Sequence, residues 1–104
     1  MSQTSEELYN DACTLIPGGV NSPVRAFKSV GTTPLYIERG EGSWIWDVAG
    51  RQFVDYCQSW GPLILGHAHP RVIEAVTETA RHGLSFGTCH TKEIEVARRV
   101  LSGK

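Results

Sequence analysis

The stretch Ser-Trp-Gly-Pro-Leu-Ile-Leu-Gly-His-Ala-His-Pro, at residues 59–70, constrains the fold more strongly than any other part of the chain. Its two glycines permit backbone angles and close approaches that a side chain forbids, and the proline between them fixes its own φ and lacks an N–H donor. In one interpretation, residues 63–65 form a short buried strand, the second glycine turns the chain and the final proline begins a helix. In the other, Trp60 and the following turn form the wall of a small-molecule pocket.

A helix is expected directly after this stretch, over residues 70–82. Proline suits the first turn of a helix, because its missing N–H would be unpaired there in any case. Gly83 supplies the glycine that is typical of the position just past a helix end. The apolar side of this helix is formed by Val72, Ile73, Val76 and Ala80.

A last helix is expected after a loop over residues 84–90. Thr91 is suited to cap this helix. Its apolar stripe is formed by Ile94, Ala97, Val100 and Leu101. The chain ends soon after the stripe, with little sequence left to cover it, so we expect the sequence to be cut from a longer protein.

Three short runs rich in β-branched and aromatic residues precede the central stretch, at residues 35–37, 44–46 and 52–56. Turns that contain glycine separate them, so the pattern predicts a three-stranded antiparallel meander. Side chains alternate along a strand, which places Trp44 and Trp46 on one face. Such an aromatic pair is typical of core or interface packing.

A first helix is predicted over residues 5–15, where Thr4 and Glu7 fit a capping box. Pro-Gly-Gly at residues 17–19 ends it, and the composition of the following loop, residues 20–27, favours extended backbone. The fold class expected for this segment is therefore α+β: an amino-terminal helix, a three-stranded antiparallel meander and two helices.

Composition narrows the function classes. The chain has 104 residues, the length of one domain, with 40% hydrophobic and 20% charged residues. A net charge of −1 argues against binding to nucleic acid or to acidic membranes. No apolar run is long enough for a transmembrane helix, and the amino terminus does not resemble a secretory signal. The three cysteines (Cys13, Cys57 and Cys89) are far apart, which favours a reducing, cytoplasmic location over a disulfide framework.

Ser22 and Arg25 are the candidate ligand-binding pair of the loop at residues 20–27. A guanidinium offers two parallel donors to a carboxylate, and a serine hydroxyl can add a third, so this pair suits an anionic group of a small ligand. From the spacing alone, however, a solvated surface arginine beside a turn serine is the favoured interpretation.

His67 and His69 are spaced for metal chelation on one side of a strand. No Asp, Glu or Cys lies nearby in sequence to complete the coordination, although Asp55 is a distant candidate. The ordinary alternative is that His69 caps the following helix and His67 makes a structural hydrogen bond. We expect no metal site.

No complete catalytic motif is present. The chain lacks a Ser-His-Asp order, a P-loop and a dinucleotide-binding glycine motif. Its lysines are Lys28, Lys92 and Lys104, and none lies in the apolar context that activates a Schiff-base lysine. We therefore expect neither a catalytic nor a cofactor-binding residue in this chain.

Three motifs carry a resemblance to a known family: Ile-Pro-Gly-Gly-Val-Asn-Ser-Pro-Val-Arg-Ala-Phe at residues 16–27, the stretch 59–70, and Gly-Leu-Ser-Phe-Gly at residues 83–87. Together they resemble the amino-terminal part of the glutamate-1-semialdehyde 2,1-aminomutases, a family of class III aminotransferases. The likeness covers nearly the whole chain. It implies a share in the α/β, aspartate aminotransferase-like fold (fold type I) of enzymes that use pyridoxal 5'-phosphate (PLP).

The resemblance also implies an activity, the conversion of glutamate-1-semialdehyde into 5-aminolevulinate for tetrapyrrole (porphyrin) biosynthesis by a homodimeric isomerase. It places Ser22 and Arg25 at the substrate carboxylate and Trp60 on the wall of the substrate pocket. Residues 1–104 would be the amino-terminal segment and part of the small domain, inactive alone, with the PLP-binding large domain and its lysine absent from this chain.

Two alternatives stay open. One is another class III aminotransferase that acts on an ω-amino acid. The other is a free-standing, non-catalytic interaction module that binds a partner through the face of Trp44 and Trp46 and through the stripe of the last helix.

Overall fold

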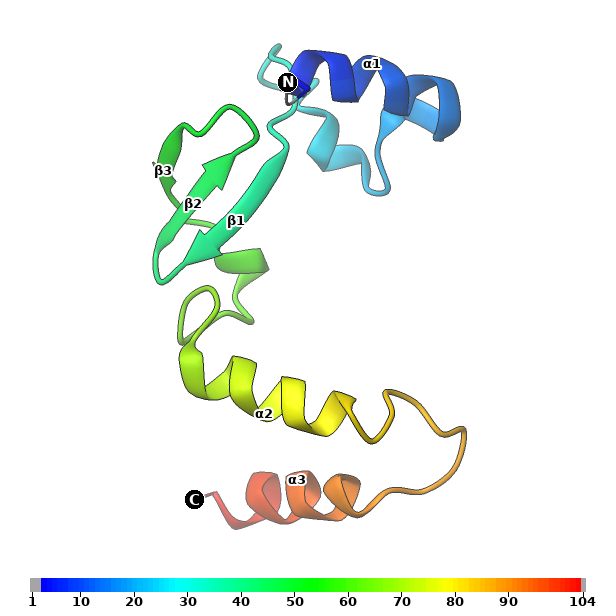
Figure 1. Ribbon diagram of the computed structural model, residues 1–104, viewed down its shortest axis with the longest axis vertical. Coiled ribbons are helices and arrows are strands. Elements are labelled where there is room, and N and C mark those ends of the chain that lie inside the picture. Colours follow the sequence, from blue (N-terminus) through cyan, green and yellow to red (C-terminus); the bar gives the residue numbers. More distant parts are fainter. Residues whose placement is uncertain (1–2, 104) are drawn as a thin grey trace. The chain divides into compact units, whose positions relative to one another are not determined.

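The computed structural model of the chain describes residues 3–103, which fall into two units that divide between His69 and Pro70. The first unit holds one α-helix, three 3₁₀ turns and a small sheet, and the second holds two helices (Figure 1). The α+β prediction of one helix, a meander and two helices is confirmed.

Helix α1, Ser5–Leu15, has the predicted bounds. Its capping box is also confirmed: the Thr4 hydroxyl accepts a hydrogen bond from the Glu7 N–H (3.2 Å), and the Glu7 carboxylate accepts one from the Thr4 N–H (2.7 Å). Two donors that would otherwise lack a partner at the start of the helix are thereby paired.

The loop after α1 corrects the expectation of extended backbone. Ser22 is extended, with φ of −144°, but Pro23–Ala26 form a 3₁₀ turn that ends at Phe27 in the left-handed region (φ 57°). The φ that Pro23 fixes is already suitable for the first position of such a turn, so the proline begins a helical turn instead of continuing an extended chain. Another 3₁₀ turn, Pro17–Gly19, follows α1.

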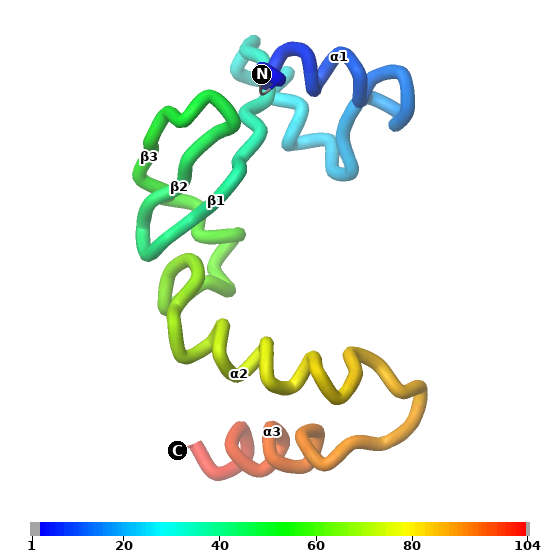
Figure 2. The backbone as a smooth tube through the Cα atoms, in the orientation of Figure 1, coloured from blue at the N-terminus to red at the C-terminus, as the bar shows by residue number. Residues whose placement is uncertain are grey.

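The sheet is the predicted antiparallel meander, with strand order β1-β2-β3 (Figure 2). Its strands are β1 (Ile37–Glu41), β2 (Trp44–Asp47) and β3 (Gln52–Val54). Glu41 pairs with Trp44 across the first turn, and Trp46 pairs with Gln52 across the second.

Several strand boundaries differ from the prediction: β1 is displaced at both ends and occupies most of the turn expected at residues 38–42, β2 ends one residue later, and β3 ends two residues earlier. β1 begins at residue 37, where the predicted run ends, because the N–H of Tyr36 donates to the Ser5 hydroxyl (3.3 Å) and not to the sheet. β3 ends at Val54 because Val54 pairs with Trp44, the first residue of β2, and the next N–H, that of Asp55, donates to the Ser43 carbonyl of the preceding turn (2.7 Å).

The two tryptophans of β2 are not core residues of the first unit. The side chain of Trp44 is 42% exposed, and Trp46 is half-buried beneath the guanidinium of Arg39, which lies 3.5 Å from the ring centroid. Such a stacked cation and ring attract each other. Packing of the pair at an interface stays a prediction.

The prediction of a buried strand at residues 63–65 is wrong. The N–H of Gly66 donates to the carbonyl of Leu63 (2.9 Å), which closes a turn, and Ile64 and Leu65 are exposed. Gly66 has φ of 79°, and an added Cβ would lie 2.8 Å from the carbonyl oxygen of Gly42. The glycine therefore allows the turn to meet the β1–β2 turn closely, through a two-way backbone pairing of Gly42 with His67.

The second unit holds α2 (Pro70–Ala80) and α3 (Thr91–Ser102). α2 ends two residues before the predicted limit, because the N–H of Gly83 bonds the carbonyl of Ala80 (3.1 Å) in a tighter turn. The cap of α3 is His90 and not Thr91, since the Nδ1 of His90 accepts the N–H of Lys92 (3.2 Å). No helix within residues 3–103 is long and apolar enough to cross a membrane.

Candidate functional site

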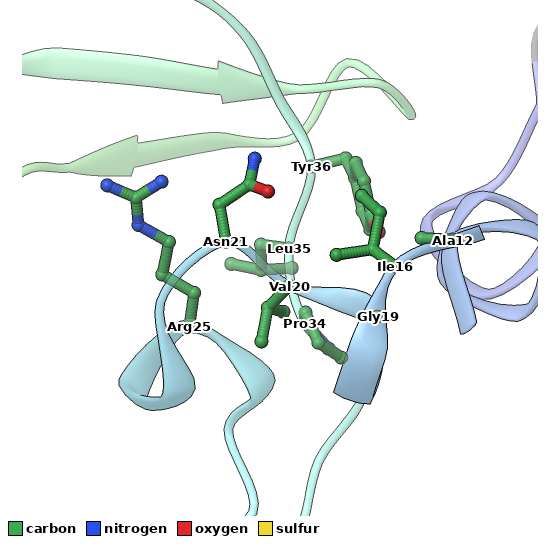
Figure 3. A pocket seen from close by; sticks show the side chains of 9 residues that line it. All are labelled: Ala12, Ile16, Gly19, Val20, Asn21, Arg25, Pro34, Leu35 and Tyr36. Atoms are coloured by element: carbon green, nitrogen blue, oxygen red, sulfur yellow. The ribbon is translucent and has the colours of Figure 1, made fainter. Parts of the chain in front are cut away.

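A cavity of about 260 Å³ opens in the first unit between α1, the loop that follows it and the segment before β1 (Figure 3). Three chain segments that are separate in the sequence therefore share one site. The residues that line the cavity are Ala12, Ile16, Gly19, Val20, Asn21, Arg25, Pro34, Leu35 and Tyr36.

The loop is held against α1 at a glycine. Gly19 is buried and has φ of 72°, and an added Cβ would lie 2.7 Å from both the Cys13 sulfur and a ring carbon of Tyr9. The Tyr9 hydroxyl also donates to the Gly18 carbonyl (3.4 Å), and burial raises the pKa of that hydroxyl. A residue with a side chain at position 19 would push the loop, and with it the cavity wall, away from the helix.

Arg25, Asn21 and Tyr36 are the polar side chains of the cavity, and the first two come from the loop after α1. Figure 3 shows the guanidinium and the amide extending to the same side of the loop. Within residues 3–103, neither side chain has a hydrogen-bond or ion-pair partner. The donors of both groups are therefore free to bind a ligand.

The chemistry of this cavity suits a small organic anion. Apolar groups from Ile16, Leu35 and Pro34 can cover a short aliphatic chain, and a guanidinium at the edge offers paired donors to a carboxylate. Arg25 is exposed, so a solvated surface arginine fits the structure as well, and its role in ligand binding stays a prediction.

Ser22 lies beside this cavity but is not among the residues that line it. It is half-buried and precedes the 3₁₀ turn Pro23–Ala26, where its backbone carbonyl accepts the N–H of Arg25 (3.0 Å). This bond fixes the backbone that carries the guanidinium. A direct contact of the Ser22 hydroxyl with a ligand stays a prediction.

Trp60 is 74% exposed and lies in a tight turn with φ of 67°. It does not line the cavity around Arg25, so the described residues of the first unit do not bring the two predicted site residues into one cavity. The pocket-wall role of Trp60 stays a prediction.

Sequence reasoning missed Asn21 and Tyr36 as cavity residues. Asn21 carries a weak signal, because it stands directly before Ser22 in the same loop. Tyr36 carries none, since its place is set by the hydrogen bond of its N–H to Ser5, a contact across 31 positions in the chain.

His67 makes the structural hydrogen bond that the sequence suggested. Its Nε2 lies 2.6 Å from a carboxylate oxygen of Asp55. This hydrogen bond is the main cause that lowers the pKa of Asp55, and backbone donors from Gln58 and Cys57 lower it further against the effect of burial. Among residues 3–103, no group of three or more His, Cys, Asp or Glu side chains gathers as metal ligands.

The described residues do not fit a PLP site. PLP enzymes hold their cofactor through a lysine that is desolvated in its pocket. Lys28 and Lys92 are exposed, and Lys104 lies outside the described residues. Residues 3–103 therefore lack the side chain that would hold that cofactor covalently.

Solved structures with a similar fold are transaminases and related enzymes. A structure titled "Transaminase with PLP bound" is 35% identical with a TM-score of 0.84, and the match covers 94% of this chain and 22% of that one. A glutamate-1-semialdehyde-aminomutase from Pseudomonas aeruginosa PAO1 is 23% identical with a TM-score of 0.78, covering 91% of this chain and 21% of that one, and shows the fold alone. The class is thus that of the fold type I aminotransferases.

Sequence relatives narrow the class. A relative from Brevibacillus brevis, glutamate-1-semialdehyde 2,1-aminomutase 2, is 60% identical over 98 residues, which are 94% of this chain and 23% of that protein. A glutamate-1-semialdehyde 2,1-aminomutase from Nitrosomonas europaea is 56% identical over 97 residues, 93% of this chain and 22% of that protein. The family model for class III aminotransferases matches residues 26–103, and the chain belongs to this family. It spans about a quarter of the length of these curated relatives.

Proposed function

We propose that the chain is the amino-terminal segment of a PLP-dependent glutamate-1-semialdehyde 2,1-aminomutase, which converts glutamate-1-semialdehyde into 5-aminolevulinate for tetrapyrrole biosynthesis. Four curated relatives with that name are 55% to 60% identical to the chain and support the proposal. The observation in the structure that carries it is the cavity around Arg25, whose guanidinium has no partner within residues 3–103.

The substrate chemistry explains the use of such a cavity. Glutamate-1-semialdehyde and 5-aminolevulinate both carry a carboxylate at the end of the molecule that does not react. A guanidinium that pairs with this carboxylate holds the reacting carbons in one place throughout the rearrangement. In the proposal, Arg25 is the main contact, the Ser22 hydroxyl and the Asn21 amide add donors from the same loop, and Trp60 forms a wall.

The remaining chemistry is assigned to the longer protein. When bound, PLP supplies an electron sink for the amino-group transfer. We assign the Schiff-base lysine and the PLP-binding large domain to sequence outside this segment, which would form the amino-terminal segment and part of the small domain. The isolated 104-residue chain is then inactive. A homodimer and a cytoplasmic location, which suits three free cysteines, complete the proposal.

One observation favours a second candidate function. Two of the structural neighbours at or above 30% identity are titled as transaminases, one of them an omega-transaminase from Sphaerobacter thermophilus with a TM-score of 0.82 over 90% of this chain. The alternative is therefore a class III aminotransferase that moves an amino group between two molecules. The higher identity to the curated aminomutases makes it the second choice.

An assay of the longer protein that carries this segment separates the two candidates. The protein is supplied with glutamate-1-semialdehyde alone, and 5-aminolevulinate is measured. In parallel it receives an ω-amino acid with a keto acid. The aminomutase forms 5-aminolevulinate without an amino acceptor. Turnover only in the second mixture would contradict the proposal and support the alternative.

A further inference from the structure

The backbone around Trp60 adopts a conformation that L-amino acids avoid. Gln58, Ser59 and Trp60 have φ of 47°, 56° and 67°, and they form a left-handed 3₁₀ turn. Hydrogen bonds from the Trp60 N–H to the Cys57 carbonyl (3.0 Å) and from the Gly61 N–H to the Gln58 carbonyl (3.1 Å) close this turn. Each such residue brings its Cβ close to a carbonyl oxygen, so surrounding contacts must hold the turn in place.

Asp55 holds the start of the turn. One oxygen of its carboxylate accepts the backbone N–H groups of Cys57 (2.9 Å) and Gln58 (3.1 Å). The side-chain amide of Gln58 donates back to the Asp55 carbonyl (3.0 Å). The Asp55 side chain is only 11% exposed, so little water competes for these bonds.

His67 holds the other end of the same segment. Its Nε2 contacts the second carboxylate oxygen of Asp55 at 2.6 Å, and its backbone pairs in both directions with Gly42 (2.8 and 2.9 Å). The ring lies against Gly40 of β1, where an added Cβ would be 2.6 Å from the His67 Cγ. His67 is thus fixed to the sheet by its backbone and by its ring.

We propose that Asp55 and His67 are positioning residues for Trp60: one carboxylate ties both ends of the segment at residues 57–67 to the sheet and so keeps the left-handed turn that carries the indole. The inference rests on the proposed function where it links Trp60 to substrate binding. A purely structural pair would stabilise the first unit as a whole, whereas a positioning pair acts on the indole and on substrate affinity.

The test uses the longer enzyme labelled with 5-fluorotryptophan, with the ¹⁹F signal of Trp60 assigned from Trp60→Phe. His67→Ala is compared with His67→Gln, whose amide N–H can still donate to Asp55. His82→Ala is the matched control, because His82 is an exposed histidine of the second unit. Each variant is measured by ¹⁹F line width, by melting temperature and by KM and kcat for glutamate-1-semialdehyde.

We expect His67→Ala to broaden or split the Trp60 signal, while the signals of Trp44 and Trp46, assigned in the same way from their own phenylalanine variants, keep their positions. KM for the semialdehyde should rise about tenfold, with kcat changed less than about twofold, because the wall is displaced and the reacting groups are not. His67→Gln should recover most of both effects. Asp55→Asn, which keeps one acceptor oxygen, provides a second variant should His67→Ala fail to fold, and should give an intermediate effect.

An unchanged Trp60 signal in both His67→Ala and Asp55→Asn would overturn the inference, as would a shift of the Trp44, Trp46 and Trp60 signals together with a parallel fall in melting temperature. Trp60→Ala separates a failure of the pocket-wall role of Trp60 from a failure of its positioning by Asp55 and His67. If it leaves KM unchanged while the Trp60 signal still responds to His67→Ala, the pocket-wall role falls and the positioning role is supported. If it raises KM but the signal does not respond, positioning by this pair is overturned and the proposed function stands.

Discussion

Asp47 is a fully buried carboxylate at the turn between β2 and β3. It accepts backbone N–H groups of Ala49 (3.0 Å) and Arg51 (2.8 Å) and pairs with the Arg51 guanidinium at 2.7 and 2.8 Å. Burial alone would raise the pKa of Asp47, but the hydrogen bonds and the charge of Arg51 outweigh burial, so the pKa lies below its usual value. The ionised form therefore stabilises the folded sheet.

This residue predicts the acid response of the first unit. A carboxyl group whose pKa is lower in the folded state than in the unfolded state contributes stability above the unfolded value, about pH 4, and loses it as the pH falls further. The pKa of Asp55 is also lowered in the folded state, so its contribution to stability is lost in the same direction, as the pH falls. We expect a constant thermal midpoint above about pH 5 and a decline below about pH 4, measured by far-UV circular dichroism.

Asp47→Asn tests the assignment. The variant should be less stable at neutral pH, because it loses the charge that pairs with Arg51, and its midpoint should decline less on acidification. Asp11→Asn, at an exposed position of α1, should follow the wild type throughout. An Asp47→Asn curve parallel to the wild type would show that Asp47 titrates alike in both states.

At the scale of the residue, the sequence predicts that the Arg25 guanidinium could bind a carboxylate, but it does not predict the cavity in which Arg25 lies. A guanidinium beside Ser22 can be recognised from the residues, and so can its fitness for a carboxylate. The cavity requires Leu35 and Tyr36 from a distant segment, which no spacing rule brings to Arg25. The turn at Trp60 was equally inaccessible, because a left-handed run of non-glycine residues opposes local preference.

At the scale of elements, Gly19 decides how α1 and the following loop fit together. Gly19→Ala should lower the free energy of unfolding by about 1 to 3 kcal/mol, because it adds a positive-φ penalty to a clash with Tyr9 and Cys13. Gly18→Ala is the matched control, since Gly18 has φ of 71° but nothing within 4 Å of an added Cβ.

Chemical denaturation of both variants measures the difference between them. The control should lose only the penalty of its backbone angle, about 1 kcal/mol. Equal losses at the two positions would contradict the close approach of Gly19 to the helix. A larger loss at position 19 supports the packing that forms one wall of the cavity.

Elements with local signals were predicted well, and elements set by distant contacts were not. The capping box fixed the start of α1, and Pro70 fixed the start of α2, because both act within one turn of helix. The start of β1 depends on the hydrogen bond of Tyr36 to Ser5, and the turn at residues 63–66 depends on the pairing of His67 with Gly42. These partners lie far away in the sequence, so hydrophobic pattern alone misplaced both elements.

At the scale of the whole molecule, apolar side chains remain exposed on both helices of the second unit. Val76 of α2 is 57% exposed, and Ile94 and Val100 of α3 are 60% and 74% exposed. Exposure of this kind is typical of surfaces that pack against further protein. Both the proposed enzyme segment and the interaction module account for it, but membership of an aminotransferase family favours the enzyme segment.

The family was accessible from the sequence because three motifs resemble those of its members, and the comparisons confirmed it. The reaction stays a proposal, because the chain spans only about a quarter of the length of its curated relatives. In the proposal, Arg25 binds the substrate carboxylate, and the reactive lysine amine belongs to the remainder of the longer protein. Arg25 is where this division can be tested.

The most direct measurement is the KM for glutamate-1-semialdehyde of the longer enzyme with Arg25→Gln, compared with Lys28→Gln. Both variants remove one positive charge from the same region, but only Arg25 lines the cavity. The account predicts a rise in KM of about 10- to 100-fold for Arg25→Gln, from the loss of a charge-assisted hydrogen-bond pair, and a change below about twofold for Lys28→Gln. Equal KM values in the two variants would contradict it.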